Sequence, residues 1–361
     1  MICSRWTNST HFHVGGSIYY SFGYRGTVMK YRELGNTGIS ASVLGFGMWP
    51  IGGTQQAGDY GNVDDVEAVK AIRRALDLGV TLFDTAPAYG NGRAESILGE
   101  ALAGRRQEAV IATKCAVHWD YAESRWVTTS NREAILQSAE ESLQRLGTDY
   151  IDLLLIHVPD PNGSPEGSMG AFRELIDSGK VRSVGVSNFT TDQIDEYENY
   201  GKIQVQQSGY NLLDRRIESK MVGHVASRDI GLMTYGSLCH GLFSGTWTSD
   251  TTFPANDWRS KGDVFGLPLF LGDNFKTNVD VARQLQDFAA ASSHSLAQLA
   301  IAWVAQHGFV ATCLAGMLSV SEVEDNVEGV NWSLTENDLR EIDEIVAKAA
   351  GTQGDEHYVV E

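Results

Sequence analysis

The sequence predicts an α/β fold in which parallel strands alternate with helices around a barrel. Short apolar runs at residues 80–83, 109–113 and 151–156 indicate buried strands, and a helix-like segment separates each run from the next. A polar residue stands at the end of each run. Because the carboxyl ends of the strands meet at one face of such a barrel, these polar residues are expected to share one site.

Four polar residues form this predicted site. Asp84, Lys114 and His157 follow the three runs, and Tyr89 lies five residues after Asp84 in a loop broken by proline and glycine. A buried carboxylate needs a cationic partner, and Lys114 is the nearest candidate. The set suits proton transfer to a carbonyl oxygen, because a nearby ammonium is expected to lower the pKa of Tyr89 from about 10. His157 would donate to the substrate oxygen or share the Tyr89 proton.

The alternative is a structural ion pair beside two ordinary loop residues. Each residue taken alone fits that alternative. The occurrence of all four at equivalent strand ends favours catalysis.

Composition limits the classes of function. The 361 residues, 42% of them hydrophobic, suffice for one barrel. A net charge of −18 argues against binding to nucleic acid or to anionic membranes, and no apolar run approaches the roughly 20 residues of a membrane helix. The four cysteines have no C-x-x-C spacing, so neither a disulfide framework nor a metal site is expected. These features indicate a cytoplasmic protein.

Three regions are predicted along the chain. Residues 1–28 lack both an apolar signal core and an amphipathic period, so they are expected to be a disordered extension. Residues 29–350 would form the barrel. Residues 351–361 make an acidic tail that either covers the pocket or is disordered.

The remaining elements follow from periodicity and turn signals. Strands at residues 31–34 and 42–46 flank a glycine-containing turn and predict a hairpin, after which the first barrel strand ends at Trp49. Further strands are predicted at 181–186, 203–206, 230–234 and 309–314. Helices are predicted at 64–78, 93–103, 131–146, 169–178, 279–291, 296–306, 320–329 and 334–350.

Two loops on the working face are candidates for the substrate pocket. Residues 115–129 are rich in aromatic residues, including Trp119, and residues 236–278 form a connection whose length is typical of functional loops. Cys115, beside Lys114, is either an activated thiol or a buried packing residue. Trp49 is either a core aromatic residue or a substrate wall.

One glycine motif is a near miss. Residues 90–95, G-N-G-R-A-E, resemble a dinucleotide fingerprint, but Glu95 stands where the third glycine belongs. No acidic residue occurs at the offset expected for the ribose. A doubly wound dinucleotide-binding fold is therefore rejected.

Several motifs resemble those of the aldo-keto reductase superfamily. D-T-A-P-A-Y-G, A-T-K, L-L-L-I-H-V-P-D and V-G-V-S-N-F occur in that family's order and spacing, and the resemblance spans about residues 31–346. G-F-G-M-W-P-I-G-G and Y-N-L-L-D-R are most similar to the bacterial-type branch that includes inositol-utilisation-associated reductases. The resemblance implies a (β/α)8 TIM barrel with an N-terminal β-hairpin and extra C-terminal helices. It also implies nicotinamide-dependent carbonyl reduction or the reverse, with Asp84, Tyr89, Lys114 and His157 as the catalytic tetrad.

The resemblance further implies where NAD(P)H binds. Ser187, Asn188 and Gln207 would hold the nicotinamide carboxamide, and Tyr235 would stack on the ring. The other implied contacts are Gly47, Met48, Gly236, Ser237, Leu238, Gly241, Gly245, Gly316, Leu318, Glu322 and Asn326. Met48 and Thr246 depart from the pattern, because relatives often have threonine and lysine there.

The cofactor is expected to be NAD(P)H, with a preference for NAD(H). Relatives that prefer NADPH carry a basic residue near positions 318 or 322, where this chain has Leu318 and Glu322. Glu322 would repel a 2′-phosphate and accept a hydrogen bond from the ribose hydroxyl of NADH. Arg259, in the long connection, is a candidate to compensate.

The substrate is expected to be a small carbonyl compound or alcohol, such as a sugar or an aromatic aldehyde, contacting Trp49, Cys115, Trp119 and His157. The competing hypothesis is a cofactor-binding regulatory subunit resembling the barrel subunits of potassium channels. The sequence predicts no oligomeric state.

Overall fold

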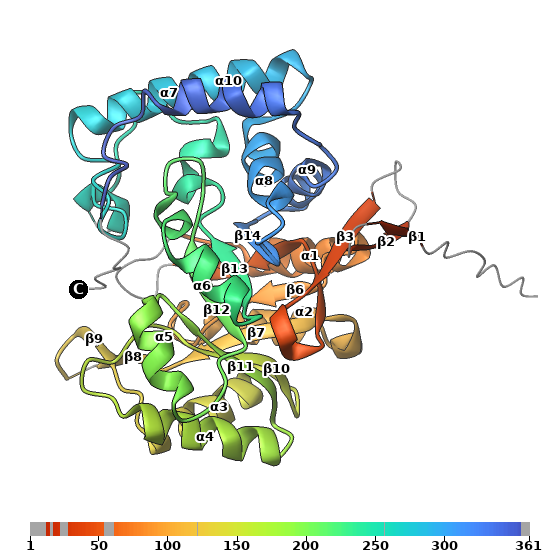
Figure 1. Cartoon of the computed structure of the whole chain (residues 1–361), viewed down its shortest axis with the longest axis vertical. Coiled ribbons are helices and arrows are strands. Elements are labelled where there is room, and N and C mark those ends of the chain that lie inside the picture. The colour runs from red at the N-terminus through yellow and green to blue at the C-terminus, as the bar shows by residue number, and fades with distance from the viewer. Residues whose placement is uncertain are drawn as a thin grey trace, which may run out of the picture.

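The computed structural model describes residues 12–14, 17–21, 28–53, 61–120, 122–255 and 257–354. Eight parallel strands close into a barrel, and the pairing of Gly316 with Gly47 joins the last strand to the first (Figure 1). The strands are β5 (Leu44–Gly47), β6 (Leu82–Asp84), β7 (Val110–Cys115), β10 (Ile151–Ile156), β11 (Val181–Ser187), β12 (Val205–Gly209), β13 (Gly231–Tyr235) and β14 (Thr312–Gly316). The predicted (β/α)8 barrel is confirmed.

Helices surround the barrel (Figure 1). They are α1 (Asp65–Asp77), α2 (Arg93–Ala101), α3 (Arg132–Leu146), α4 (Pro165–Asp177), α5 (Thr191–Glu198), α6 (Met221–Ser227), α7 (Asp273–Ala291), α8 (Leu296–Gln306), α9 (Val320–Gly329) and α10 (Glu336–Val346). Side-chain caps start many of them: Asp64 accepts from the amides of Val66 and Glu67, and Thr190, Ser295 and Thr335 form capping boxes.

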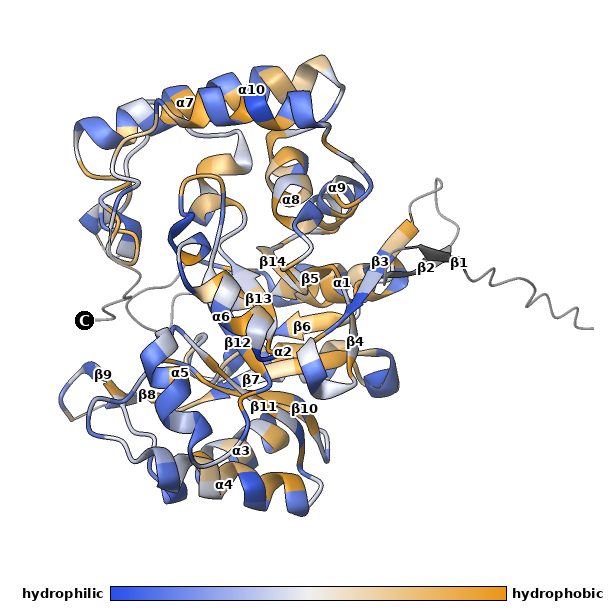
Figure 2. Ribbon diagram, in the orientation of Figure 1, coloured by the Kyte–Doolittle hydropathy of each residue, from blue (hydrophilic) through white to orange (hydrophobic). Residues whose placement is uncertain are grey.

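The apolar core has two layers. One fills the barrel and includes Leu34, Leu82, Leu153, Leu155 and Met233. The other lies between the strands and the helices, and Figure 2 shows apolar central strands beneath helices of mixed polarity. A parallel strand that is covered on both faces needs apolar residues on both of them. This explains why the strand segments of the sequence are continuous apolar runs rather than alternating ones.

The N-terminal hairpin differs from its prediction. Its strands are β3 (Val28–Glu33) and β4 (Ser40–Ser42), so the predicted second strand at 42–46 is wrong: the chain turns after Ser42, and Leu44 already belongs to the barrel. β1 (Phe12–Val14) and β2 (Ser17–Ser21) extend the same sheet. Residues 1–11, 15–16 and 22–27, and residues 355–361 of the acidic tail, lie outside the described part of the chain. The limits of the three predicted regions stay a prediction.

Other differences have local causes. The predicted loop at 115–129 contains an antiparallel hairpin, β8 (Val117–Asp120) with β9 (Arg125–Thr128). Helices α5 and α6 were not predicted, because each is short and α6 carries a glycine in its first turn. Helix α7 begins at Asp273 rather than at 279, since its first residues are mostly polar and hide the helical period.

Within the described residues, no single helix is both long and apolar enough to cross a membrane. Helices α7 and α8 meet the length and composition criteria only together, and an 88° bend separates them.

Two glycines in the hairpin turn give a stability prediction. Gly35 and Gly38 both have positive φ, 55° and 70°, but a side chain at Gly35 would overlap the backbone nitrogen of Gly231, whereas one at Gly38 meets nothing within 4 Å. Gly38→Ala should therefore lower the free energy of unfolding by about 1 kcal/mol, through backbone strain alone. Gly35→Ala should lower it by about 3 kcal/mol or more, because it adds a clash. Urea denaturation measures both, and equal losses would contradict the close approach at Gly35.

Candidate active site

The four predicted catalytic residues lie together. Lys114, at the end of β7, donates from Nζ to Asp84 Oδ2 at 2.7 Å and to Tyr89 Oη at 3.0 Å. The ring of His157 meets that of Tyr89 edge-on, with 5.8 Å between their centroids. The barrel therefore brings the polar residues from three separate strand ends into contact with one another.

The loop that carries Tyr89 is held by local backbone contacts. The Tyr89 amide donates to the carbonyl of Ala86, and the carbonyl of Tyr89 accepts from the amide of Ala94 at the start of α2. Gly90, with φ of 60°, packs so closely on the carbonyl of Gly52 that a side chain would overlap it. The tyrosine hydroxyl is thereby directed back toward the end of β6.

Burial decides the protonation states. It raises the pKa of Tyr89 well above its usual value, and the negative charge of Asp84 acts in the same direction, so the expected lowering by Lys114 is wrong. Burial lowers the pKa of Lys114, although Asp84 opposes this. Burial and then the charge of Lys114 lower the pKa of His157. At neutral pH Tyr89 holds its proton and His157 is uncharged.

The residues expected to bind the nicotinamide connect to this group. Gln207 donates from Nε2 to Asp84 Oδ1 at 2.7 Å, and it lies inside β12 rather than at its end. Asn188 donates to the carbonyl of His157 and to Ser187 Oγ, both at 3.1 Å. Tyr235 donates to Asn188 Oδ1 at 2.8 Å. A single network joins the predicted amide site to the predicted tetrad.

An aromatic cover lies beside Tyr89 and consists of Trp49, His240, Trp258 and Phe265. Trp49 is nearly parallel to both Tyr89 and Trp258, at centroid distances of 6.3 and 5.3 Å. His240 and Phe265 contact both tryptophans, and burial lowers the pKa of His240 to about 4.

Only Trp49 of this cover was among the predicted site residues. His240 and Phe265, from the long connection, were not predicted; the length of that connection and its tryptophans, Trp258 among them, had already made it a candidate for the substrate pocket.

The segment from Gly236 to Gly245 fits a bound phosphate group. Ser237 is buried, and its Oγ has no hydrogen-bond partner among the described residues. Gly241, with φ of 106°, lies in a 3-10 helix (Cys239–Ser244) that follows Leu238, and Gly245, with φ of 76°, directly follows that helix. A buried hydroxyl without a partner is uncommon, and an oxygen of the cofactor is a suitable one.

The start of α9 forms the other end of the predicted cofactor site, beyond Gly316. Glu322 Oε2 accepts from the amide of Leu318 at 2.6 Å, and its own amide donates to Ser319 Oγ at 3.3 Å. Asn326 is buried one turn further along. The carboxylate of Glu322 therefore already takes up one backbone amide beside the start of α9, a position that favours negative charge.

Three further predicted contact residues pack their side chains against other parts of the protein. The side chain of Met48 is fully buried in the core, while its amide donates to the carbonyl of Asp84. Cys115 is buried, its thiol donates to the carbonyl of Leu155, and burial raises its pKa, so it packs rather than reacts. Trp119 packs edge-on against Trp126 in the β8–β9 hairpin.

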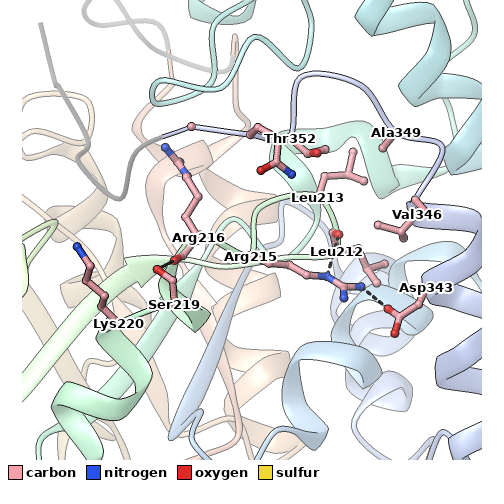
Figure 3. Close-up of a pocket in the computed structure, with 13 residues that line it drawn as sticks. Leu212, Leu213, Arg215, Arg216, Ser219, Lys220, Asp343, Val346, Ala349 and Thr352 are labelled. Atoms are coloured by element: carbon pink, nitrogen blue, oxygen red, sulfur yellow. Dashed lines mark hydrogen bonds and ion pairs between the residues drawn. The ribbon is translucent and has the colours of Figure 1, made fainter.

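A cavity of about 840 Å³ lies between the loop after β12 and helix α10 (Figure 3). Arg215, Arg216, Lys220 and Asp343 are among its lining residues, and Arg215 forms an ion pair with Asp343 at 2.8 Å. The tetrad does not line this cavity. In the described residues, no group of three or more histidine, cysteine, aspartate or glutamate side chains is placed to hold a metal ion.

The buried Lys114–Asp84 pair predicts non-additive stability effects. Lys114→Met leaves the Asp84 carboxylate buried with only the neutral Gln207 donor, so the free energy of unfolding should fall by about 3 kcal/mol. The double variant Asp84→Asn/Lys114→Met should lose about 2 kcal/mol less than the sum of the two single losses. Urea denaturation of the four proteins completes the cycle, and additive losses would contradict direct coupling.

Comparison with known proteins identifies the family. A model of the Aldo/keto reductase family matches residues 43–347. The aldo-keto reductase YhdN of Bacillus subtilis is 36% identical over 88% of this chain and 94% of its own, and the NADH-specific methylglyoxal reductase of Escherichia coli is 31% identical over 89% and 100%. The structure of the glycerol dehydrogenase AKR11B4 from Gluconobacter oxydans is similar with a TM-score of 0.80 and 32% identity, covering 91% of this chain and 99% of that one. The chain thus belongs to the aldo/keto reductase family.

Proposed function

We propose that this protein catalyses hydride transfer between NAD(P)H and a small carbonyl compound or alcohol, with Tyr89 exchanging the proton. The observation that carries the proposal is the position of Lys114 Nζ, which is within hydrogen-bond distance of both Tyr89 Oη and Asp84 Oδ2. A buried ammonium in contact with a tyrosine hydroxyl stabilises the phenolate that forms when the proton leaves.

The residues divide the work of reduction as follows. When bound, NAD(P)H supplies the hydride. Tyr89, which holds its proton, donates it to the substrate oxygen, and Lys114 then donates to the phenolate oxygen. Asp84 balances the charge of Lys114 throughout. Neutral His157 orients the substrate oxygen by a hydrogen bond, and the aromatic cover excludes water.

The same proposal assigns the nicotinamide to the network beside the tetrad. Ser187, Asn188 and Gln207 offer hydroxyl and amide groups that complement a carboxamide, and Tyr235 offers a ring face. Because Gln207 uses its NH₂ group on Asp84, its oxygen is the atom available to accept from the carboxamide.

The central test is Tyr89→Phe. The variant keeps the ring that stacks on Trp49 and loses the proton donor, so kcat should fall about a thousandfold or more. NADH binding, followed by fluorescence titration, should change less than about threefold, because the hydroxyl lies on the substrate side.

A retained kcat in Tyr89→Phe would overturn the role of Tyr89. A wild-type protein that binds NADH and turns over no aldehyde or ketone would instead favour the regulatory alternative, a cofactor-binding barrel like the potassium-channel subunits.

The proposed cofactor is NAD(H). The Glu322 carboxylate accepts from the amide of Leu318, just before α9, and a 2′-phosphate there would face a like charge. The similarity to an enzyme named NADH-specific methylglyoxal reductase supports the same preference.

Replacement of Glu322 by glutamine tests the preference. The change removes the negative charge and keeps a group that can accept from the Leu318 amide, so NADPH binding should tighten about tenfold relative to NADH binding. Glu324→Gln is the matched control, since Glu324 lies on the same helix and pairs with Arg74. Tighter binding of NADPH than NADH by the wild-type protein, in the same fluorescence titration, would contradict the proposal.

The substrate class follows from the aromatic cover. The ring of Trp49 packs nearly parallel to that of Tyr89, so a substrate at the Tyr89 hydroxyl would lie close to Trp49. Such a wall suits the flat face of a sugar or of an aromatic aldehyde. The motifs around Trp49 and at residues 210–215 support a place in the bacterial-type branch with inositol-utilisation-associated reductases, and the charge of −18 supports a cytoplasmic location.

A further inference from the structure

Glu95 is a buried carboxylate outside the predicted tetrad. It replaces the third glycine of the rejected dinucleotide fingerprint, and it lies in the first turn of α2, six residues after Tyr89. Its side chain is fully buried. An ionised carboxylate in such a place needs strong partners, because desolvation of an unpaired charge is costly.

Both oxygens of Glu95 have partners from other elements. Oε1 accepts from Thr113 Oγ1 of β7 at 2.6 Å, and Oε2 accepts from Arg145 Nε of α3 at 2.6 Å. Thr113 directly precedes Lys114 in the strand. Neighbouring side chains of a strand point to opposite faces. Glu95 therefore binds β7 on the face that meets the helices, while the side chain of Lys114 points into the barrel toward Asp84 and Tyr89.

The same cluster also supports the loop that carries Tyr89. Gly92, the residue before α2, has φ of 87°, and a side chain there would meet the aliphatic part of Arg145. The amide of Ala94, beside Glu95, donates to the carbonyl of Tyr89. Helix α2, through Ala94 and Glu95, is therefore bonded both to the loop that carries Tyr89 and to the strand that carries Lys114, whose side chains meet at 3.0 Å.

We propose that Glu95 is a positioning residue that fixes the Lys114 ammonium against the Tyr89 hydroxyl, acting through Thr113 and Arg145. The inference rests on the proposed catalytic role of Tyr89 and Lys114. Glu95 touches neither the substrate nor the cofactor in this scheme. Glu95 contributes by setting the position of the Lys114 ammonium relative to the Tyr89 hydroxyl. The rate of proton transfer is sensitive to that position.

The charge of Glu95 adds a second effect. Burial lowers the pKa of Lys114, while the charges of Asp84 and then Glu95 raise it. The other titratable groups near Lys114 are Tyr89 and His157, and Glu95 itself faces Arg145. Removal of the Glu95 charge would therefore allow Lys114 to lose its proton at lower pH.

The experiment compares three variants of the full-length protein in the direction of carbonyl reduction. Glu95→Gln removes the charge and keeps an oxygen that can accept from Thr113. Thr113→Val removes the hydrogen bond and keeps the charge, and Thr113→Ser restores the hydroxyl. Glu100→Gln, an exposed residue of the same helix, is the control.

The expected results separate position from charge. Glu95→Gln and Thr113→Val should each lower kcat roughly tenfold, with the dissociation constant for NADH within about twofold of wild type. Only Glu95→Gln should also move the alkaline fall of kcat to lower pH. Thr113→Ser and Glu100→Gln should match wild type in both respects.

Other results would overturn the inference. One such result is a Glu95→Gln variant whose kcat and pH profile equal those of the wild type. Another is a fall in kcat that is fully explained by a smaller fraction of protein able to bind NADH. If Glu95→Gln does not fold, the contrast between Thr113→Val and Thr113→Ser decides, and equal kcat values reject the positioning role. Tyr89→Phe reports separately on the proposed function: if it retains turnover, that function fails, and if only the Glu95 results fail, the tetrad stands.

Discussion

The ion pair between Lys114 and Asp84 is the constraint on which the site depends. A cation buried inside a barrel is tolerated only beside a counter-charge, and the 2.7 Å contact provides it. The second oxygen of Asp84 binds Gln207 from the opposite side of the barrel, and the third donor bond of Lys114 reaches the carbonyl of Thr85. Strands β6, β7 and β12 are thereby fixed relative to one another at their carboxyl ends, where Tyr89 needs a defined neighbour.

The barrel separates this polar end from an apolar floor. Leu34, from the N-terminal hairpin, packs with the inward-facing residues Leu82, Leu153 and Met233, so the lower part of the barrel is filled by hydrocarbon. Charged groups inside are consequently confined to the ends of the strands, where loops can adjust to a ligand. The apolar floor and the layer beneath the helices hold the buried apolar residues of the core, whereas the polar residues proposed for the chemistry lie at the strand ends.

The sequence predicted the parts of the site that follow directly from strands. Asp84, Lys114 and His157 each follow an apolar run, and parallel pairing was enough to bring them together. It did not predict His240 or Phe265, because their places depend on how a long connection packs against the barrel. The pKa of Tyr89 was expected in the wrong direction, since the degree of burial is a property of the folded chain and outweighed the nearby ammonium. Glu95 was noticed only as a failed glycine, although it is buried and ion-paired.

The hydrogen bond from Tyr235 to Asn188 has a consequence for cofactor recognition. Asn188 itself is held in a left-handed conformation, with φ of 63°, by the strand end and by its bonds to Ser187 and His157. The ring of Tyr235 is thus locked in one rotamer by the protein alone. The conformational entropy of that ring is lost during folding rather than on association, so a nicotinamide would meet a rigid platform and retain more of its contact energy as affinity.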